Sequence, residues 1–236
     1  MRPATSAVPR EMETSNPPLV RPPRRSHPDG AVRYDSRNYA LLNRRFETAR
    51  NMRRVVRYLR PRCGDRLLEI GCGRGWLTQR VQHLCPATCG VDVNPQSIAH
   101  GVTSGLSVMD AVQLDFEDQR FDKLYSLHAI EHIVDAQLAV AEMFRVLVPG
   151  GRALLVYPAE LIRGMYAVPG AWLGFGSPLL ARKLHVHKFT PSRIRRLAAL
   201  AGFRHVESAF DLFFTPQFMT VLEKPQVEQA AISRRR

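Results

Sequence analysis

Two short stretches of the sequence hold residues whose types and spacing could do chemistry. The first, SLHAIEHIVD (126–135), contains His128, Glu131 and His132 in the order H-x-x-E-H. On one helix, His128 and His132 would stand four residues apart and share a face. This is the spacing of an inverted zinc-protease motif. The motif alone leaves open whether it serves a zinc hydrolase or another reaction, such as proton removal by a histidine near neutral pH.

The second stretch is LLEIGCGRGWL (67–77), in which Gly71, Gly73 and Gly75 fall between an expected strand and an expected helix. Glycines there permit a tight turn, and the start of the helix offers free N–H groups to a ligand. The dinucleotide pattern G-x-G-x-x-G fails because the position after Gly75 is Trp76. The next apolar segment ends at VDVN and puts Asp92 where a carboxylate can accept both ribose hydroxyls of an adenosine ligand.

Apolar segments and helical segments alternate through the middle of the chain. Strands are expected at RLLEIG (66–71), TCGVDV (88–93), SVMDA (107–111), FDKLYSLH (121–128) and RALLVYP (152–158). This alternation predicts an α/β fold with a doubly wound, mostly parallel sheet. Two further apolar segments, at about 204–210 and 213–223, predict a hairpin at the edge of that sheet.

Composition divides the chain into segments. Residues 1–35 form a Pro/Arg-rich tail that is expected to be disordered, and residues 36–60 an N-terminal basic helical cap. Residues 61–225 form the main domain, with an insertion at 159–189, and residues 226–236 form a second disordered basic tail. The insertion is apolar and interrupted by Gly and Pro. This composition suits a lid over a hydrophobic substrate, a patch that inserts into a membrane surface, or ordinary packing onto the core.

The charge of the chain is strongly positive and unevenly placed. The net charge is +13 over 236 residues, and residues 1–66 hold 16 arginines against 6 acidic residues. Such an arm could attract nucleic acid or an anionic membrane, or be a solvated tail. No apolar run approaches the roughly 18 residues of a membrane span, and no secretory signal is visible. We therefore expect a soluble cytoplasmic protein in which all four cysteines are free thiols.

Taken together, the glycine turn, the acid on the second strand and the strand–helix rhythm resemble the class I S-adenosylmethionine-dependent methyltransferases, in the small-molecule and quinone branch, over about residues 60–224. The resemblance implies a Rossmann-like sheet of seven strands, with an antiparallel last strand inserted before the sixth, and S-adenosylmethionine as cofactor. It assigns the Asp-Ala pair that meets the adenine edge to residues 110 and 111 rather than to Asp115. The cofactor-binding residues it implies are Glu69, Gly71, Gly73, Gly75, Asp92, Val93, Asp110, Ala111 and Ser126.

The resemblance also changes the interpretation of H-x-x-E-H. Ligands of a doubly wound sheet bind outside the carboxyl ends of its strands, and His128 lies at or just past the end of the fourth strand. We expect His128 to be the general base, with Glu131 and His132 as second choices, and zinc hydrolysis is disfavoured. Alternatively, Glu131 only anchors the start of the following helix. Some quinone-modifying relatives carry an acid at the position of His128 and are associated with a divalent cation, so the metal question stays open.

The function expected from these residues is methyl transfer to a small hydrophobic acceptor, most simply at an oxygen atom of a quinol, a polyketide or a lipid-linked molecule. One alternative is a methyltransferase acting on RNA or protein, which the basic arm favours. However, the fourth strand ends in SLHAIEH and not in the N/D-P-P-Y of many base-amino methyltransferases. Another alternative is a non-catalytic partner subunit that binds the cofactor without turnover. Peripheral contact with an anionic membrane is a further expectation for the apolar insertion and its basic neighbours.

Overall fold

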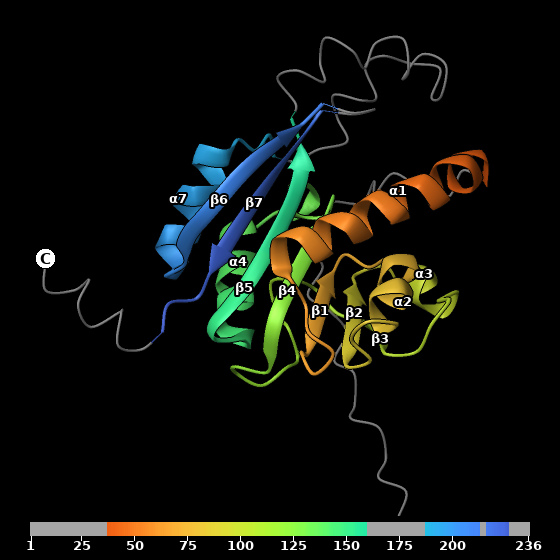
Figure 1. Cartoon of the computed structure of the whole chain (residues 1–236), viewed down its shortest axis with the longest axis horizontal. Helices are drawn as coiled ribbons and strands as arrows, with labels where there is room; N and C mark the ends of the chain where they lie inside the picture. Colours follow the sequence, from red (N-terminus) through yellow and green to blue (C-terminus); the bar gives the residue numbers. More distant parts are fainter. Residues whose placement is uncertain (1–36, 160–186, 213–215, 227–236) are drawn as a thin grey trace, which may run out of the picture.

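One mixed β-sheet forms the centre of the structure. The computed structural model describes residues 37–159, 187–212 and 216–226, and in this part of the chain seven strands lie in the order β3-β2-β1-β4-β5-β7-β6 (Figure 1). The strands are β1 (Leu67–Ile70), β2 (Thr88–Asp92), β3 (Leu106–Val108), β4 (Phe121–Leu127), β5 (Leu147–Pro158), β6 (Arg204–Asp211) and β7 (Gln217–Glu223).

The direction of the strands confirms the predicted topology. Strands β1 to β5 pair in parallel, whereas β7 pairs antiparallel with both β5 and β6. The last strand in the sequence is therefore inserted before β6. Because β1, β2 and β4 run parallel, their carboxyl ends at Ile70, Asp92 and Leu127 lie along one edge of the sheet, where ligands of such folds bind.

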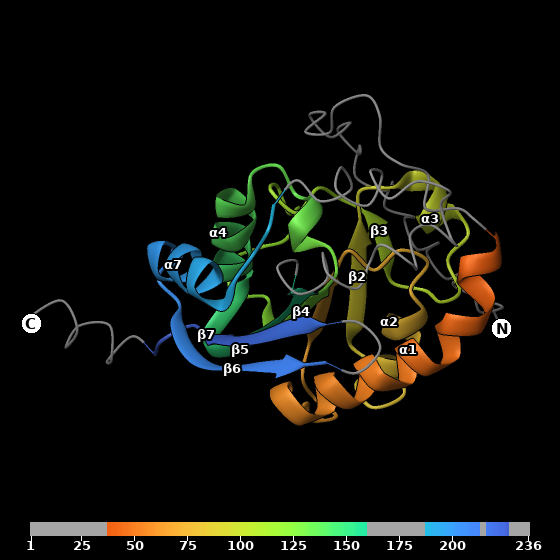
Figure 2. The same ribbon diagram turned by 90° about the horizontal axis from the view of Figure 1, so that it is seen from above.

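Helices cover both faces of the sheet. On one face, α1 (Arg37–Leu59) and α2 (Trp76–Gln82) enclose an apolar cluster, while α4 (Ala136–Val146) and α7 (Pro191–Ala201) pack on the other face (Figure 2). Both faces of the central strands are covered, which explains why most of their residues are apolar. Helix α1 belongs to this body, because its Val55 and Leu59 are almost fully buried in the cluster.

The helices begin and end where the sequence carries capping residues. The side chain of Asn94 accepts hydrogen bonds from the backbone at the start of α3 (Pro95–Ala99), and Asp135 and Thr190 do the same for α4 and α7. Helix α7 ends at Gly202, whose φ of 99° is in the left-handed region. These side-chain caps replace the hydrogen bonds that the first N–H groups of a helix lack.

Two strands differ from the sequence prediction. Strand β5 starts at Leu147, immediately after α4, and so includes the Pro-Gly-Gly segment that suggested a turn. The segment is held because Gly150 N donates to the Lys224 carbonyl and Lys224 N donates to that of Gly151. The third strand is also shorter than predicted and ends at Val108, so that Asp110 and Ala111 lie in the turn after it.

Several predictions fall on residues that the structure does not describe. These are the disordered tails at 1–35 and 226–236 (apart from Gln226) and the insertion at 159–189 (apart from its described ends). Within the described residues, no helix has the length and apolar character needed to cross a membrane.

Candidate functional site

The glycine turn between β1 and α2 has the conformation that the sequence predicted. Gly71, Gly73 and Gly75 all have positive φ, at 78°, 54° and 78°. A Cβ on Gly71 would lie 2.3 Å from the Cβ of Ala129, and one on Gly75 would collide with Leu106, whereas one on Gly73 would meet nothing within 4 Å. Two of the glycines thus allow close packing of the turn, and the third leaves open space beside the backbone.

The Asp92 carboxylate holds the turn from the neighbouring strand. Its Oδ2 accepts a hydrogen bond from Gly73 N at 2.8 Å, and its Oδ1 accepts one from Asn94 N at 2.8 Å. A carboxylate has about four acceptor positions, so each oxygen keeps capacity for a ligand hydroxyl. Val93 follows directly and is 37% exposed, which offers an apolar surface next to this carboxylate.

Asp110 and Ala111 lie in the turn after β3 and are both buried, with 8% exposure each. The Asp110 Oδ1 accepts a hydrogen bond from Val112 N at 3.2 Å. Beside them on the same sheet edge are Asp92 and Val93, because Met109 N donates to the Asp92 carbonyl. The described geometry therefore fits an adenosine group: a carboxylate for the ribose, an apolar residue beside it, and a polar buried turn further along the edge.

Glu69 is a buried carboxyl group at the start of the glycine turn. Its Oε2 accepts hydrogen bonds from the Thr78 hydroxyl at 2.5 Å and the Tyr125 hydroxyl at 3.3 Å. Burial raises the pKa of Glu69 to about 8, because desolvation outweighs these hydrogen bonds, which favour the charged form. Neither hydrogen-bond partner carries a positive charge. The group is therefore placed to respond to a cationic ligand.

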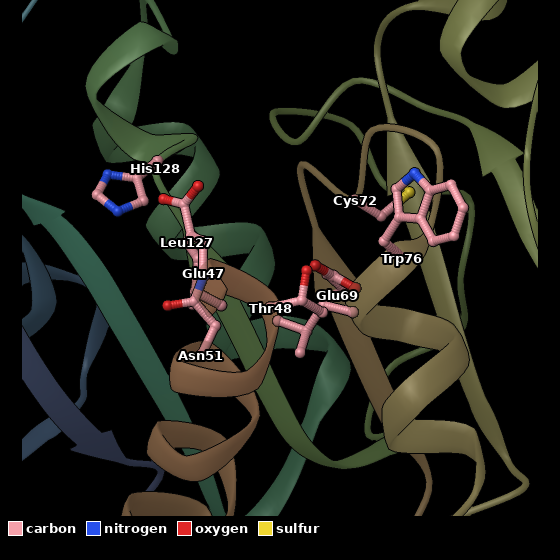
Figure 3. Close-up of a pocket in the computed structure, with 9 residues that line it drawn as sticks. Glu47, Thr48, Asn51, Glu69, Cys72, Trp76, Leu127 and His128 are labelled. Atoms are coloured by element: carbon pink, nitrogen blue, oxygen red, sulfur yellow. The ribbon is translucent and has the colours of Figure 1, made fainter. Parts of the chain in front are cut away.

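A cavity of about 270 Å³ opens between the glycine turn, the end of β4 and helix α1 (Figure 3). Its lining joins predicted site residues to residues that the sequence did not point to. It is lined by Glu47, Thr48, Asn51, Glu69, Cys72, Trp76, Leu77, Leu127 and His128. Glu69 and His128 were predicted, whereas the three residues of α1 and Cys72 were missed as site residues. The α1 residues carry no motif, and only the docking of the helix brings them here.

Three polar side chains at the end of β4 and in the segment that follows it have buried atoms with no hydrogen-bond partner among the described residues. They are Ser126 Oγ, His128 Nε2 and both carboxylate oxygens of Glu131. Glu131 is 1% exposed, and its Oε1 lies 3.5 Å from His128 Nδ1. Among the described residues no backbone N–H donates to either oxygen, and the side-chain cap of the following helix is Asp135. The alternative interpretation, in which Glu131 anchors the start of that helix, is therefore wrong.

The backbone of His128 is also unusual. Its φ of 56° puts a non-glycine residue in the left-handed region, and a hydrogen bond from its N–H to the Val156 carbonyl, at 2.9 Å, holds it there. Such conformations cost free energy and collect at functional sites. This backbone turn directs the imidazole into the lining of the cavity, where Figure 3 shows it across from α1.

The H-x-x-E-H stretch does not form a metal-binding helix face. His128 follows the strand, and Glu131 and His132 belong to a short 3-10 helix, η1 (Ile130–His132), so the two histidines do not share a helix. His132 is not part of the cavity lining. Among the described residues, no group of three or more His, Cys, Asp or Glu side chains is arranged to hold a metal ion.

Comparison with known proteins identifies the class to which this fold and site belong. Residues 68–155 match the family model of a methyltransferase domain. The ubiquinone biosynthesis O-methyltransferase of Rhizobium etli is 27% identical over 184 residues, which cover 73% of each chain. The malonyl-[acyl-carrier protein] O-methyltransferase of Hahella chejuensis is 28% identical over 64% of this chain, and the match spans 54% of that enzyme.

Solved structures agree on the fold. A S-adenosylmethionine-dependent methyltransferase of Archaeoglobus fulgidus superimposes with a TM-score of 0.60 at 18% identity, covering 76% of this chain and 93% of the other. At this identity the likeness concerns the fold alone. With the family match and the curated relatives, the chain belongs to the class I S-adenosylmethionine-dependent methyltransferases, and S-adenosylmethionine is the cofactor that this family implies.

Proposed function

We propose that the chain transfers a methyl group from S-adenosylmethionine to an oxygen atom of a small hydrophobic acceptor, with His128 as the general base. The observation that carries the proposal is the paired placement of His128 and the buried Glu131 at the end of β4, in a cavity that also contains Glu69. The two curated relatives described above are both named O-methyltransferases, and their named substrates differ. The proposal therefore extends to a class of acceptor and not to one molecule.

The cofactor would lie along the carboxyl edge of β1, β2 and β4. Asp92 and Val93 would hold the ribose and the adenine, with Asp110 and Ala111 at the far edge of the ring. Glu69 and the glycine turn would hold the methionine end, beside Ser126. When bound, S-adenosylmethionine supplies an electrophilic methyl group on a sulfonium ion.

The residues of the cavity can position an acceptor and remove its proton. Leu127, Leu77 and Trp76 give the lining an apolar part that suits a hydrophobic ring or chain and excludes water. Glu131 faces Nδ1 of His128 and so favours the tautomer with hydrogen on that nitrogen. The Nε2 atom is buried and has no hydrogen-bond partner among the described residues, and in this proposal its lone pair would take the hydroxyl proton of an acceptor bound against it.

The test separates cofactor binding from turnover. Calorimetry with S-adenosylhomocysteine should show binding, and NAD should not compete with it. Tritium from labelled S-adenosylmethionine should enter an apolar product when the protein is added to an extract of its source organism. A chain that binds NAD and not S-adenosylhomocysteine would contradict the proposal.

The role of His128 is tested by His128→Ala. General acid–base catalysis contributes typically about 10²- to 10⁴-fold, so kcat should fall by about this factor while the affinity for S-adenosylhomocysteine is kept. The exposed His83, at the end of α2, offers the matched control His83→Ala, which should turn over like the wild type. Unchanged turnover in His128→Ala would refute the assignment of the base.

A further inference from the structure

The face of α1 that lines the cavity is polar, although the opposite lining is largely apolar. Glu47, Thr48 and Asn51 are spaced so that they share one side of the helix, and all three line the cavity. Figure 3 shows these side chains together on the α1 side of the cavity, with His128 across from Glu47. An acceptor that enters the cavity would therefore meet polar groups on the α1 side.

Asn51 is held by a buried arginine. The Nη1 atom of Arg54 donates to Asn51 Oδ1 at 3.0 Å and to Gln217 Oε1 at 2.6 Å, and its Nη2 donates to Asp211 Oδ2 at 2.5 Å. Arg54 is 5% exposed and Asn51 is 9% exposed. The guanidinium thus binds one oxygen atom within α1 and two that link α1 to β7 and β6, a geometry that suits its planar fork of donors.

This contact decides which end of the Asn51 amide faces the cavity. An amide carries an acceptor oxygen and a donor NH₂ group, and a guanidinium has donors alone. Arg54 must therefore take the oxygen, and the NH₂ group is the end that is left for a ligand. Asn51 itself is part of the cavity lining, so this NH₂ group is the part of the amide that can meet a ligand there.

We propose that Asn51 is a specificity-determining residue that donates a hydrogen bond from its side-chain NH₂ to an oxygen atom of the methyl acceptor, and that Arg54 is the positioning residue that turns the amide. The inference rests on the proposed function, because it assumes that the acceptor binds in this cavity. It deepens that function by defining the acceptor class: a molecule with a second oxygen, such as a carbonyl or an ether, close to the hydroxyl group that His128 would deprotonate.

The decisive variant is Asn51→Asp. A carboxylate of the same shape keeps an oxygen for Arg54 and adds an ion pair, so a purely structural role of Asn51 predicts a variant that behaves like the wild type. The same change removes the NH₂ donor and places negative charge at the cavity. Under our proposal it weakens binding of the acceptor while the fold is kept. Asn51→Ala should weaken binding too, and Arg53→Ala, on an exposed part of the same helix, is the control.

Two phenols of similar size serve as probes: guaiacol, which has a methoxy oxygen beside its hydroxyl, and 2-ethylphenol, which has a carbon there. Dissociation constants are measured by ligand-observed NMR on the protein saturated with S-adenosylhomocysteine. A neutral hydrogen bond is worth about 0.5–1.5 kcal/mol, so the wild type and Arg53→Ala should prefer guaiacol by about 2- to 12-fold. Asn51→Asp and Asn51→Ala should lose this preference.

Arg54→Lys and Arg54→Met test the positioning role through the same ratio. Lysine keeps the charge but cannot bridge three oxygens in a plane, so the preference should fall in part with lysine and fully with methionine. Thermal unfolding is followed in parallel to show that each variant is folded. If Asn51→Asp kept the wild-type preference, or if the wild type bound both phenols equally while binding S-adenosylhomocysteine, this inference would be overturned and the proposed function would stand.

Discussion

Replacing Glu69 with glutamine should change how the stability of the protein depends on pH. Glu69 is 5% exposed, and burial raises its pKa from 4.5 to about 8. A carboxyl group with a raised pKa in the folded state binds its proton more tightly there than in the unfolded chain. Its contribution to stability is therefore complete below pH 4.5 and is lost as the pH rises towards 8.

The size of the effect follows from the two pKa values. They differ by about 3.5, and each unit corresponds to 1.36 kcal/mol, so the full loss of unfolding free energy is about 5 kcal/mol as an upper estimate. Between pH 5.5 and 7.5, most of which lies between the two pKa values, Glu69 should remove roughly 2 kcal/mol from the unfolding free energy of the wild type. Glutamine has nearly the same shape and does not titrate, and the two hydroxyl groups of Thr78 and Tyr125 can still bond to it.

The assay is urea unfolding of the cofactor-free protein at pH 5.5, 6.5 and 7.5. The difference in unfolding free energy between Glu69→Gln and the wild type should rise in favour of the variant by roughly 1 kcal/mol per pH unit. Glu117→Gln, at an exposed carboxyl group, should track the wild type at every pH. Parallel pH profiles for the wild type and Glu69→Gln would refute the reasoning that burial keeps this carboxyl protonated at neutral pH.

Three further substitutions test the site. Gly71→Ala should lower the unfolding free energy, measured by urea unfolding, by roughly 3 kcal/mol or more. The reason is that a Cβ at this position, where φ is 78°, would lie 2.3 Å from the Cβ of Ala129. A variant as stable as the wild type would contradict the close packing. Gly73→Ala has open space at the same position, so it should cost only about 1 kcal/mol yet lower the affinity for S-adenosylhomocysteine, seen by calorimetry. Asp92→Asn replaces one of the two oxygens that accept hydrogen bonds from Gly73 N and Asn94 N. We expect the affinity for S-adenosylhomocysteine to fall about 10-fold or more. Unaltered affinity would refute the role of Asp92 in binding the ribose.

The parts of the site that depend on neighbouring residues were predictable from the sequence. Gly71, Gly73 and Gly75 require positive φ for reasons of local sterics, and Asp92 follows from its place at the end of an apolar strand. The same holds for the caps at Asn94 and Thr190, which satisfy backbone groups two or three residues away. The positive φ of the glycines and the caps are set by residues a few positions apart, so a pattern in the sequence carries the information, although the contacts of Gly71 with Ala129 and of Gly75 with Leu106 appear only in the fold.

Other features depend on contacts between distant parts of the chain. The Pro-Gly-Gly segment suggests a turn, but pairing with Lys224 draws it into β5. Asn51 looks like an ordinary polar helix residue until Arg54 meets Gln217, which is 163 positions away in the sequence. The lack of a hydrogen-bond donor to the Glu131 carboxylate among the described residues likewise could not be predicted from the sequence, because it depends on how the folded chain surrounds this side chain.

The link between α1 and the β6–β7 hairpin bears on the order in which the molecule can be completed during synthesis. Arg54 is made early, but Asp211 and Gln217, which receive its hydrogen bonds, are made 157 and 163 residues later. Until the ribosome has released the last strand, the arginine lacks these two oxygens, and burying it without them would be costly. A nascent chain stopped before residue 211 could therefore form the glycine turn while helix α1 was not yet fixed against the sheet. The cavity lined by α1 would then become able to bind the acceptor only when β7 has been made.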